Sequence, residues 1–60
     1  MQSEYTELVT IEELGDILMT SRTNVYRLLR SGELKAFKLG KVWKIPKVSV
    51  ELYIKERSNL

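Results

Sequence analysis

The chain has 60 residues, no cysteine and no histidine, and it carries 10 Lys and Arg against 8 Asp and Glu, a formal net charge of +2. A chain this short forms one small domain, and the missing residue types exclude disulfides, Cys or His zinc sites and catalysis by Cys or His. No apolar run approaches the roughly 20 residues of a membrane-spanning helix. We therefore expect no enzyme, no cofactor, no metal, no membrane association and no small-molecule substrate.

The charges are segregated along the chain. Residues 1–19 contain five acidic residues and no basic one, whereas residues 20–47 contain eight basic residues and one acid, Glu33. Residues 48–60 are balanced. A basic segment next to an acidic one creates a local positive field that the small net charge conceals. The segregation favours a polyanionic partner over a surface that is charged only for solubility.

The first predicted helix follows a polar start. Residues 1–9 are expected to form a loose N-terminal arm with some extended character around Leu8 and Val9. Thr10 and Glu13 have the spacing of a capping box, in which each side chain accepts a hydrogen bond from the other residue's amide. One apolar stripe follows at helical spacing: Ile11, Leu14, Ile17 and Leu18. Gly15 costs this helix roughly 1 kcal/mol relative to alanine, and close approach of another helix is the usual reason.

A second short helix is predicted after a break at residues 19–21. Ser21 is a good N-cap, so the helix begins at Arg22. Gly32 is placed to take the left-handed conformation that ends a helix. The inward face consists of Val25, Leu28 and Leu29. Two helices joined by so short a break are typical of a helix-turn-helix unit.

The outward face of this second helix is polar and basic. Since successive residues rotate by about 100°, burial of the apolar positions leaves a defined set outside. This set has Thr23, Arg27 and Arg30 at its centre, Asn24 and Tyr26 on opposite flanks, and Arg22 toward the first helix. Guanidinium, hydroxyl and amide groups read base edges and bind phosphates. For Tyr26, contact with a partner and simple coverage of the core fit the pattern equally well.

Residues 37–45, FKLGKVWKI, alternate apolar residues and lysines around Gly40 and predict a β-hairpin. Two registers are possible. A two-residue turn at Gly40-Lys41 pairs Leu39 with Val42, whereas a three-residue loop over residues 40–42 pairs Leu39 with Trp43. Because a shift of one residue moves every side chain to the other face, the hydrophobic pattern favours the three-residue loop.

In that register one face of the hairpin is apolar and closes the core, and the other face is a lysine surface. The apolar face consists of Phe37, Leu39, Trp43 and Ile45, and the lysine face of Lys38 and Lys44. Trp43 is therefore interpreted as a core residue. A stacking platform for single-stranded nucleic acid needs several exposed aromatic side chains along a basic groove.

A third helix is predicted near the end of the chain. Pro46 suits its first turn, where a missing N–H matters least, and Val50, Tyr53 and Ile54 give it an apolar face. Residues 58–60 are expected to be a frayed tail. The predicted fold is mainly α with a small β-hairpin: a winged helix-turn-helix over residues 10–57, in the order helix, helix, hairpin, helix.

The stretch TIEEL…TSRTNVYRLLRSGELKAFKLGKVWKIP resembles the excisionase-family helix-turn-helix domain, a relative of the MerR-like winged helices. The resemblance extends from about Thr10 to Ile54. Its motifs are Ser21-Arg22, Val25-Tyr26-Arg27, Ser31-Gly32-Glu33-Leu34, and Gly40 before Trp43-Lys44-Ile45. Two places depart from the family pattern: Lys35 stands where many members have proline, and Lys41-Val42 where they often have glycine or arginine.

The resemblance implies that the second helix enters the major groove of double-stranded DNA and that the hairpin is a wing on the backbone or minor groove. The candidate contacts of the helix are Arg22, Thr23, Asn24, Tyr26, Arg27 and Arg30. Those of the wing are Lys38, Lys41 and Lys44. The departures at Lys35 and at Lys41-Val42 affect the expected path of the hairpin more than they affect the expected fold.

The function implied by the resemblance is that of an excisionase, a recombination directionality factor of a mobile element. A small transcriptional regulator with the same domain is one alternative. A winged helix that docks on an acidic protein is another, from a different class. The expected partner is double-stranded DNA. On that DNA the chain is expected to contact either an integrase or recombinase, or a second copy of itself. The expected location is the cytoplasm, at the nucleoid, in a bacterium or phage.

Overall fold

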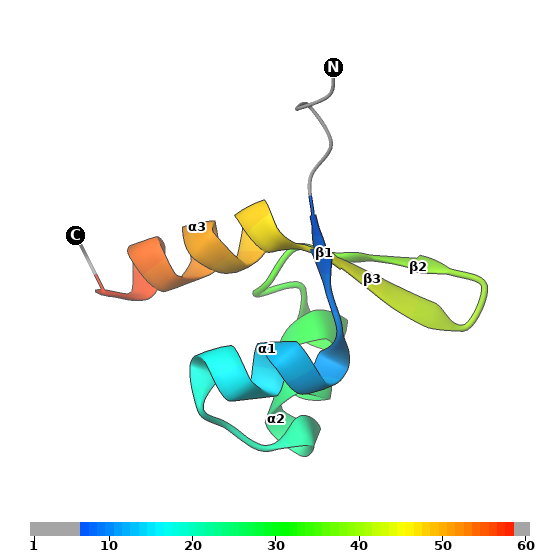
Figure 1. The fold of residues 1–60 in the computed structure, drawn as a ribbon, viewed down its shortest axis with the longest axis horizontal. Helices are drawn as coiled ribbons and strands as arrows, with labels where there is room; N and C mark the ends of the chain where they lie inside the picture. The colour runs from blue at the N-terminus through cyan, green and yellow to red at the C-terminus, as the bar shows by residue number, and fades with distance from the viewer. Residues whose placement is uncertain (1–6, 59–60) are drawn as a thin grey trace.

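The computed structural model describes residues 7–58; the parts of the predicted arm and tail at residues 1–6 and 59–60 lie outside the described residues. It contains three helices and a three-stranded antiparallel sheet with strand order β1-β3-β2 (Figure 1). The elements are β1 (Leu8–Val9), α1 (Ile11–Leu18), α2 (Arg22–Ser31), β2 (Phe37–Leu39), β3 (Val42–Pro46) and α3 (Lys47–Ser58). The predicted winged helix-turn-helix is confirmed, with one additional strand. The division into arm, domain and tail stays a prediction.

Both helices of the helix-turn-helix unit begin at their predicted caps. The Thr10 hydroxyl accepts a hydrogen bond from the Glu13 amide at 3.0 Å, and the Glu13 carboxylate accepts one from the Thr10 amide at 2.8 Å. The Ser21 hydroxyl accepts from the Asn24 amide at 3.2 Å. Gly32 ends α2 with a φ of 83°. These local hydrogen bonds satisfy backbone groups that a helix end leaves unpaired.

The connection between α1 and α2 is tight. A Cβ added to Gly15 would lie 3.3 Å from the Thr20 carbonyl oxygen and 3.7 Å from Cγ2 of Val25. Close approach of both the turn and α2 therefore accounts for this glycine. Met19 ends α1 in the left-handed conformation with a φ of 55°, which is unfavourable for a residue that has a Cβ.

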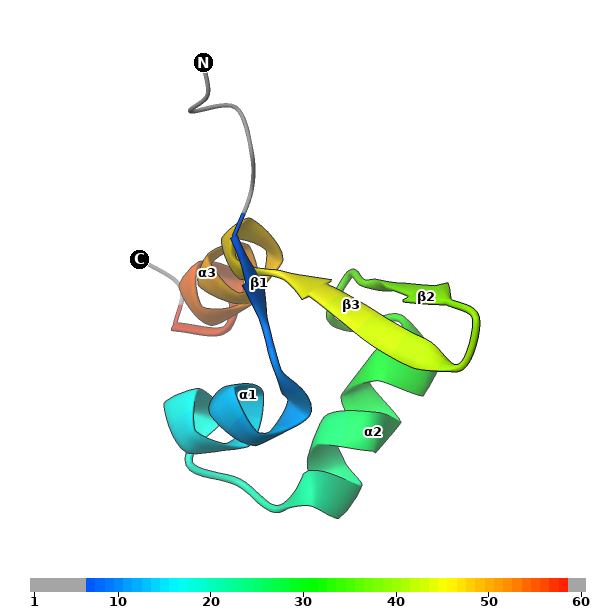
Figure 2. The same cartoon turned by 45° about the vertical axis from the view of Figure 1, so that its right-hand side comes forward.

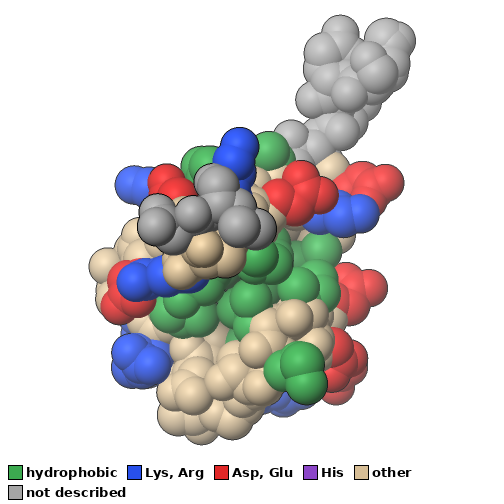
Figure 3. Space-filling view, turned by 90° about the vertical axis from the view of Figure 1, so that its left-hand side faces the viewer, with side chains coloured by type: hydrophobic (Ala, Val, Ile, Leu, Met, Phe, Trp, Pro, Cys, Tyr) green, Lys and Arg blue, Asp and Glu red, His purple; other side chains and the backbone are tan. Residues whose placement is uncertain are grey.

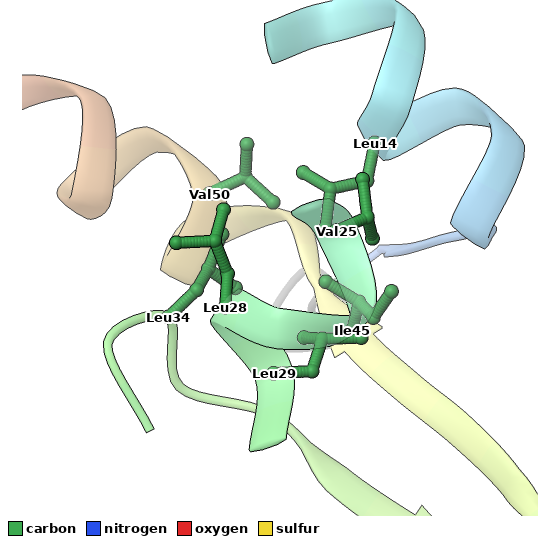
Figure 4. Packing of buried hydrophobic residues seen from close by; sticks show 7 residues of the cluster. All are labelled: Leu14, Val25, Leu28, Leu29, Leu34, Ile45 and Val50. Atoms are coloured by element: carbon green, nitrogen blue, oxygen red, sulfur yellow. The ribbon is translucent and has the colours of Figure 1, made fainter. Parts of the chain in front are cut away.

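Seven buried apolar side chains from all three helices, β3 and the α2–β2 connection form the core (Figure 4). They are Leu14, Val25, Leu28, Leu29, Leu34, Ile45 and Val50. Of the predicted apolar faces of the helices, Ile11, Leu18 and Tyr53 are partly buried against this core, and two further residues are exposed. Ile17 is 45% exposed, because it lies at the edge of the α1 stripe, and Ile54 is 40% exposed, because α3 packs mainly against β3.

The hairpin has the register that the hydrophobic pattern disfavoured. β2 and β3 pair Phe37 with Lys44, Lys38 with Trp43 and Leu39 with Val42. The turn therefore contains two residues, and the predicted three-residue loop is wrong. The physical reason lies in the turn: Gly40 has a φ of 66°, whereas the φ of Lys41 is negative. A glycine with positive φ in the first central position is the requirement of a type II′ hairpin turn.

The inner face of the sheet carries Val9, Trp43 and Ile45. Val9 pairs directly with Ile45, and Trp43 lies two residues before Ile45, on the same face of β3. Trp43 packs against the core, as predicted. Lys38 also lies on this face, opposite Trp43, with its Nζ 5.4 Å from the centre of the indole ring.

The outer face of the sheet carries the apolar residues of β2. Phe37 and Leu39 are 52% and 66% exposed, so the prediction that they close the core is wrong. Lys44 lies beside Phe37 on this face, and the prediction that Lys38 and Lys44 share a face is wrong as well. Both errors follow from the two-residue turn.

β1 and the start of α3 complete the sheet. Leu8 pairs with Pro46, which makes the predicted extended character a strand. Pro46 is the last residue of β3 and α3 begins at Lys47, one residue later than predicted. The Lys47 amide donates to the Glu7 carbonyl at 2.6 Å. Across residues 7–58, no helix has both the length and the apolar character of a membrane span.

Candidate nucleic-acid interface

α2 runs beneath the hairpin and leaves one side open to solvent (Figure 2). Thr23, Arg27 and Arg30 are exposed on that side, as the helical spacing predicted. On the opposite side Val25 and Leu28 are buried in the core. This packing fixes the rotation of α2 about its axis, so the polar side must face outward.

Asn24 connects the outer side of α2 to the preceding turn. Its side-chain amide donates to the Thr20 hydroxyl at 2.9 Å, and its side-chain oxygen accepts from the Arg27 guanidinium at 3.4 Å. Asn24 and Arg27 line a hollow of about 360 Å³ together with Tyr53 and Arg57 of α3. Asn24 is therefore placed to orient Arg27.

Arg57 is a basic residue near α2 that the sequence analysis left out. Its guanidinium lies 5.0 Å from the centre of the Tyr53 ring and binds the Glu33 carboxylate at 2.8 Å. No sequence signal pointed to it, because its place beside Arg27 depends on how α3 packs. By holding Glu33, it also leaves Arg30 without a neutralising carboxylate among the described residues.

Arg22 lies at the other flank, beside α1, as predicted. Its guanidinium is 3.1 Å from the Glu12 carboxylate, and the two side chains are 61% and 79% exposed. Exposed ion pairs contribute only about 0–1 kcal/mol. This pair therefore leaves Arg22 able to exchange its carboxylate for another anion.

A groove of about 580 Å³ separates α2 from the hairpin. Tyr26 and Arg30 line it from α2, and Tyr26 is half-buried. The wing lysines line the opposite wall: Lys38, Lys41 and Lys44. β1 pairs only with the last two residues of β3, so the backbone edge of residues 42–44 is open along this wall. No acidic side chain of residues 7–58 lines the groove.

The predicted site residues thus fall into two groups, one on each side of the α2 outer face. Tyr26, Arg30 and the three wing lysines share the groove toward the hairpin. Asn24 and Arg27 share the hollow toward α3. Thr23 lies between the two groups by helical spacing, and Arg22 stands apart in its pair with Glu12.

Such a surface can bind a polyanion through guanidinium and ammonium groups, with hydroxyl and amide donors between them.

The described residues were also compared with the requirements of a metal site. Within residues 7–58, no group of three or more His, Cys, Asp or Glu side chains could hold a metal ion.

Curated relatives match most of the chain, and two of them are described here by name. A protein of Saccharopolyspora erythraea named "Probable excisionase" is 35% identical over 46 residues, 77% of this chain and 47% of that protein. A protein of Mycobacterium tuberculosis (strain CDC 1551) named "Putative DNA-binding protein" is 34% identical over 44 residues, 73% of this chain and 56% of that protein. The chain therefore spans about half the length of the curated relatives it matches. No solved structure matches it.

The family comparison covers nearly all of the described chain. The profile of a family described as "Helix-turn-helix domain" matches residues 8–58, which include β1 and all of α3. Together with the similarity to the S. erythraea protein, this confirms the resemblance to the excisionase type of helix-turn-helix. The chain belongs to the helix-turn-helix domain family.

Proposed function

We propose that the chain is a sequence-specific double-stranded DNA-binding protein that acts as an excisionase, a recombination directionality factor of a mobile element. The observation that carries the proposal is the outer side of α2, where Arg27 and Arg30 are exposed and Arg30 lines the lysine groove, which no acidic side chain of residues 7–58 lines. The names of the two relatives support it. The action is binding, not catalysis.

In the proposed complex α2 enters the major groove, whose width of about 12 Å admits a helix. Arg27 has the fork of donors that matches the O6 and N7 atoms of guanine, and such a bidentate contact contributes about 1–3 kcal/mol of discrimination. Asn24 restrains the Arg27 guanidinium before binding, which lowers the entropy lost when the contact forms. Thr23 and Tyr26 are the flanking contacts.

The hairpin is the proposed wing. Lys38, Lys41 and Lys44, together with Arg22 and Arg30, neutralise phosphates on the backbone or at the minor groove. Lys38 is held over the Trp43 ring, so its ammonium is positioned in advance. Each neutralised phosphate releases counterions, and the affinity therefore falls as salt rises.

An excisionase acts beside an integrase or recombinase, and one chain of this size covers few base pairs. We therefore propose an integrase, or a second copy of the chain, as the partner on DNA at the nucleoid. A transcriptional regulator with the same domain remains the competing role. An excision assay on the mobile element separates the two roles, since only an excisionase raises the yield of excised circles at constant integrase.

The first experiment is a titration of a labelled duplex of random sequence across salt concentrations. We expect log affinity to fall with log salt at a slope of about −3 to −5, as for several neutralised phosphates. Site selection with the wild type and with Arg27→Ala then tests base reading. If the chain fails to bind duplex at low salt, the proposal fails, and the basic surface belongs to an acidic protein partner.

A further inference from the structure

The hollow of about 360 Å³ between α2 and α3 lies on the flank of α2 that is turned away from the hairpin. Asn24 and Arg27 line it from α2, and Thr20 lines it from the preceding turn. On the other flank of α2, Tyr26 and Arg30 line the lysine groove. A helix in the major groove has the sugar-phosphate backbone of one strand on each side. The lysine groove and this hollow, called the α2–α3 hollow below, therefore face different strands.

Arg57 brings a second guanidinium to the α2–α3 hollow. It lies one helical turn after Tyr53, whose half-buried ring packs against the core. The Arg57 Cζ is 5.0 Å from the centre of that ring, and its Nη2 donates to Glu33 Oε1 at 2.8 Å. The guanidinium is thus held from two sides in the unbound protein, which lowers the entropy lost when it binds a partner.

The contact with Glu33 leaves most of the Arg57 donors available. A guanidinium has five N–H donors, and among residues 7–58 the side chain of Arg57 donates one hydrogen bond, through Nη2. The side chain is 58% exposed, so an anion can reach the other donors from solvent. The planar fork of a guanidinium matches the oxygens of a phosphate group.

The surroundings of Arg57 also favour an anion. Arg27 adds a second positive charge to the hollow, and no acidic side chain of residues 7–58 lines it. Figure 3 shows the side of the molecule on which α3 ends, where acidic side chains gather mainly along one margin. Two guanidinium groups that share one hollow repel each other, and an anion between them removes the repulsion. The α2–α3 hollow therefore fits a phosphate group.

We propose that Arg57 binds a backbone phosphate at the α2–α3 hollow, on the DNA strand opposite the one that the hairpin contacts. The inference rests on the proposed DNA binding and adds a contact from α3, outside the helix-turn-helix unit and the hairpin. Phosphate contacts fix the orientation of a protein on the duplex. With one strand held on each flank, the rotation of α2 in the major groove is fixed while Arg27 reads the bases.

The first test is the salt dependence of binding to a duplex of random sequence. Arg57→Gln should lower the affinity on the order of tenfold and make the salt slope shallower by about 1, since each neutralised phosphate contributes about 0.9. Lys55→Gln, the matched control, removes the same charge from an exposed residue of α3 that does not line the hollow. Arg57→Lys keeps the charge and should keep the slope. A loss in Arg57→Gln no larger than in Lys55→Gln overturns the phosphate contact.

Glu33 distinguishes this contact from a purely structural role of Arg57. If Arg57 only tethered α3 to the chain after α2, Glu33→Gln and Arg57→Gln would weaken binding alike. A carboxylate beside a bound phosphate is repulsive, so Glu33→Gln should instead raise the affinity, by about threefold more than Glu51→Gln does. Glu51 is an exposed acid of α3 away from the hollow. The gain should disappear in the double variant with Arg57→Gln, and equal losses in the two single variants overturn the proposal.

Neutral methylphosphonate groups locate the bound phosphate. In a duplex that carries the selected site, single phosphates are replaced one at a time. We expect one position at which the replacement costs the wild type on the order of tenfold and costs Arg57→Gln less than about twofold. Positions at which Lys41→Ala removes the effect should lie on the other strand. If no position responds to Arg57→Gln, or both sets lie on one strand, the proposal is wrong.

Binding by the wild type separates the two proposals. If it binds neither duplex at low salt, the DNA function fails and the Arg57 contact fails with it. If it binds with a steep salt slope that Arg57→Gln leaves unchanged, only the Arg57 contact fails. Circular dichroism checks that each variant folds. Should Arg57→Gln not fold, Glu33→Gln decides alone: a gain above that of Glu51→Gln supports the contact, and no gain overturns it.

Discussion

α2 and β2 both interleave apolar and basic residues, yet only α2 buries its apolar ones. On α2 the apolar Leu29 is 4% exposed and Arg27 is exposed. On β2 the apolar Leu39 is 66% exposed, and Lys38, which is also exposed, lies on the inner face over Trp43. α2 follows its hydrophobic pattern, whereas β2 exposes the apolar side chains that the pattern predicted to be buried.

The difference shows which forces orient each element. The inward side of a helix is fixed by many apolar residues at once, and α2 has three buried ones. A three-residue strand contributes few such residues, so the turn decides its register. The type II′ geometry at Gly40, with β3 held by Ile45 in the core, outweighs the burial of two apolar side chains.

The strongest test of the comparison is a matched pair of substitutions. Leu29→Ala should lower the free energy of unfolding by about 2–5 kcal/mol, the range for a buried leucine. Leu39→Ala should change it by less than about 0.5 kcal/mol, as for a surface site. Urea unfolding followed by circular dichroism measures both. Equal losses in the two variants would show that Leu39 is buried and the register incorrect.

The two regions should also differ in how they bind DNA. Arg27→Ala should cost about 1–3 kcal/mol at a selected site and relax its base preference. Lys41→Ala should weaken binding to all sequences alike and reduce the salt slope by about 1. Fluorescence anisotropy with selected and random duplexes checks both, with Lys55→Ala on α3 as the control. Loss of base preference in Lys41→Ala would reverse these roles.

The hairpin turn provides a smaller test. Gly40→Ala should lower the free energy of unfolding by about 1–2 kcal/mol, because a Cβ is disfavoured at positive φ. Lys41→Ala, in the same turn but at negative φ, is its control and should be nearly neutral. Thermal unfolding of both variants measures the two changes in stability. A neutral Gly40→Ala would favour the three-residue loop.

In the turn between α1 and α2, by contrast, a substitution to glycine should raise the free energy of unfolding. Met19 has a left-handed backbone and a side chain that is 91% exposed, so Met19→Gly removes strain and few contacts. We expect a gain of about 0.5–1 kcal/mol in the free energy of unfolding. Met19→Ala keeps the Cβ and should leave stability nearly unchanged. If both variants lose stability equally, the Met19 side chain makes contacts of its own.

The sequence was sufficient where structure depends on neighbours along the chain. Thr10, Ser21 and Gly32 act through hydrogen bonds and backbone conformation within one turn of helix, so the caps were predictable. Since the caps and the helical period fix the sides of α2, the outward position of Arg27 was predictable too. The same local logic applied to the hairpin, where glycine in the first turn position is a type II′ signal. That signal and the hydrophobic pattern favour different registers, and the structure has the register of the signal.

Other features depend on contacts between distant parts of the chain. The pairing of Leu8 with Pro46 and the place of Arg57 beside Arg27 both follow from packing across the molecule. No periodicity within residues 47–58 indicates where α3 will lie. The lysine groove was likewise predicted only as a set of residues, because its walls come from α2, β1 and the hairpin.

The pairing of β1 with β3 also has a consequence for the order of folding. The contacts between α1 and α2 are local, and such contacts form early. β1 comes near the start of the chain but pairs with the last two residues of β3, the second strand of the hairpin, so it must wait until Pro46 has left the ribosome. With only two paired residues, it should also be the first strand to detach in the folded protein. Hydrogen exchange would therefore find β1 the least protected part of the sheet, while α2 remains closed.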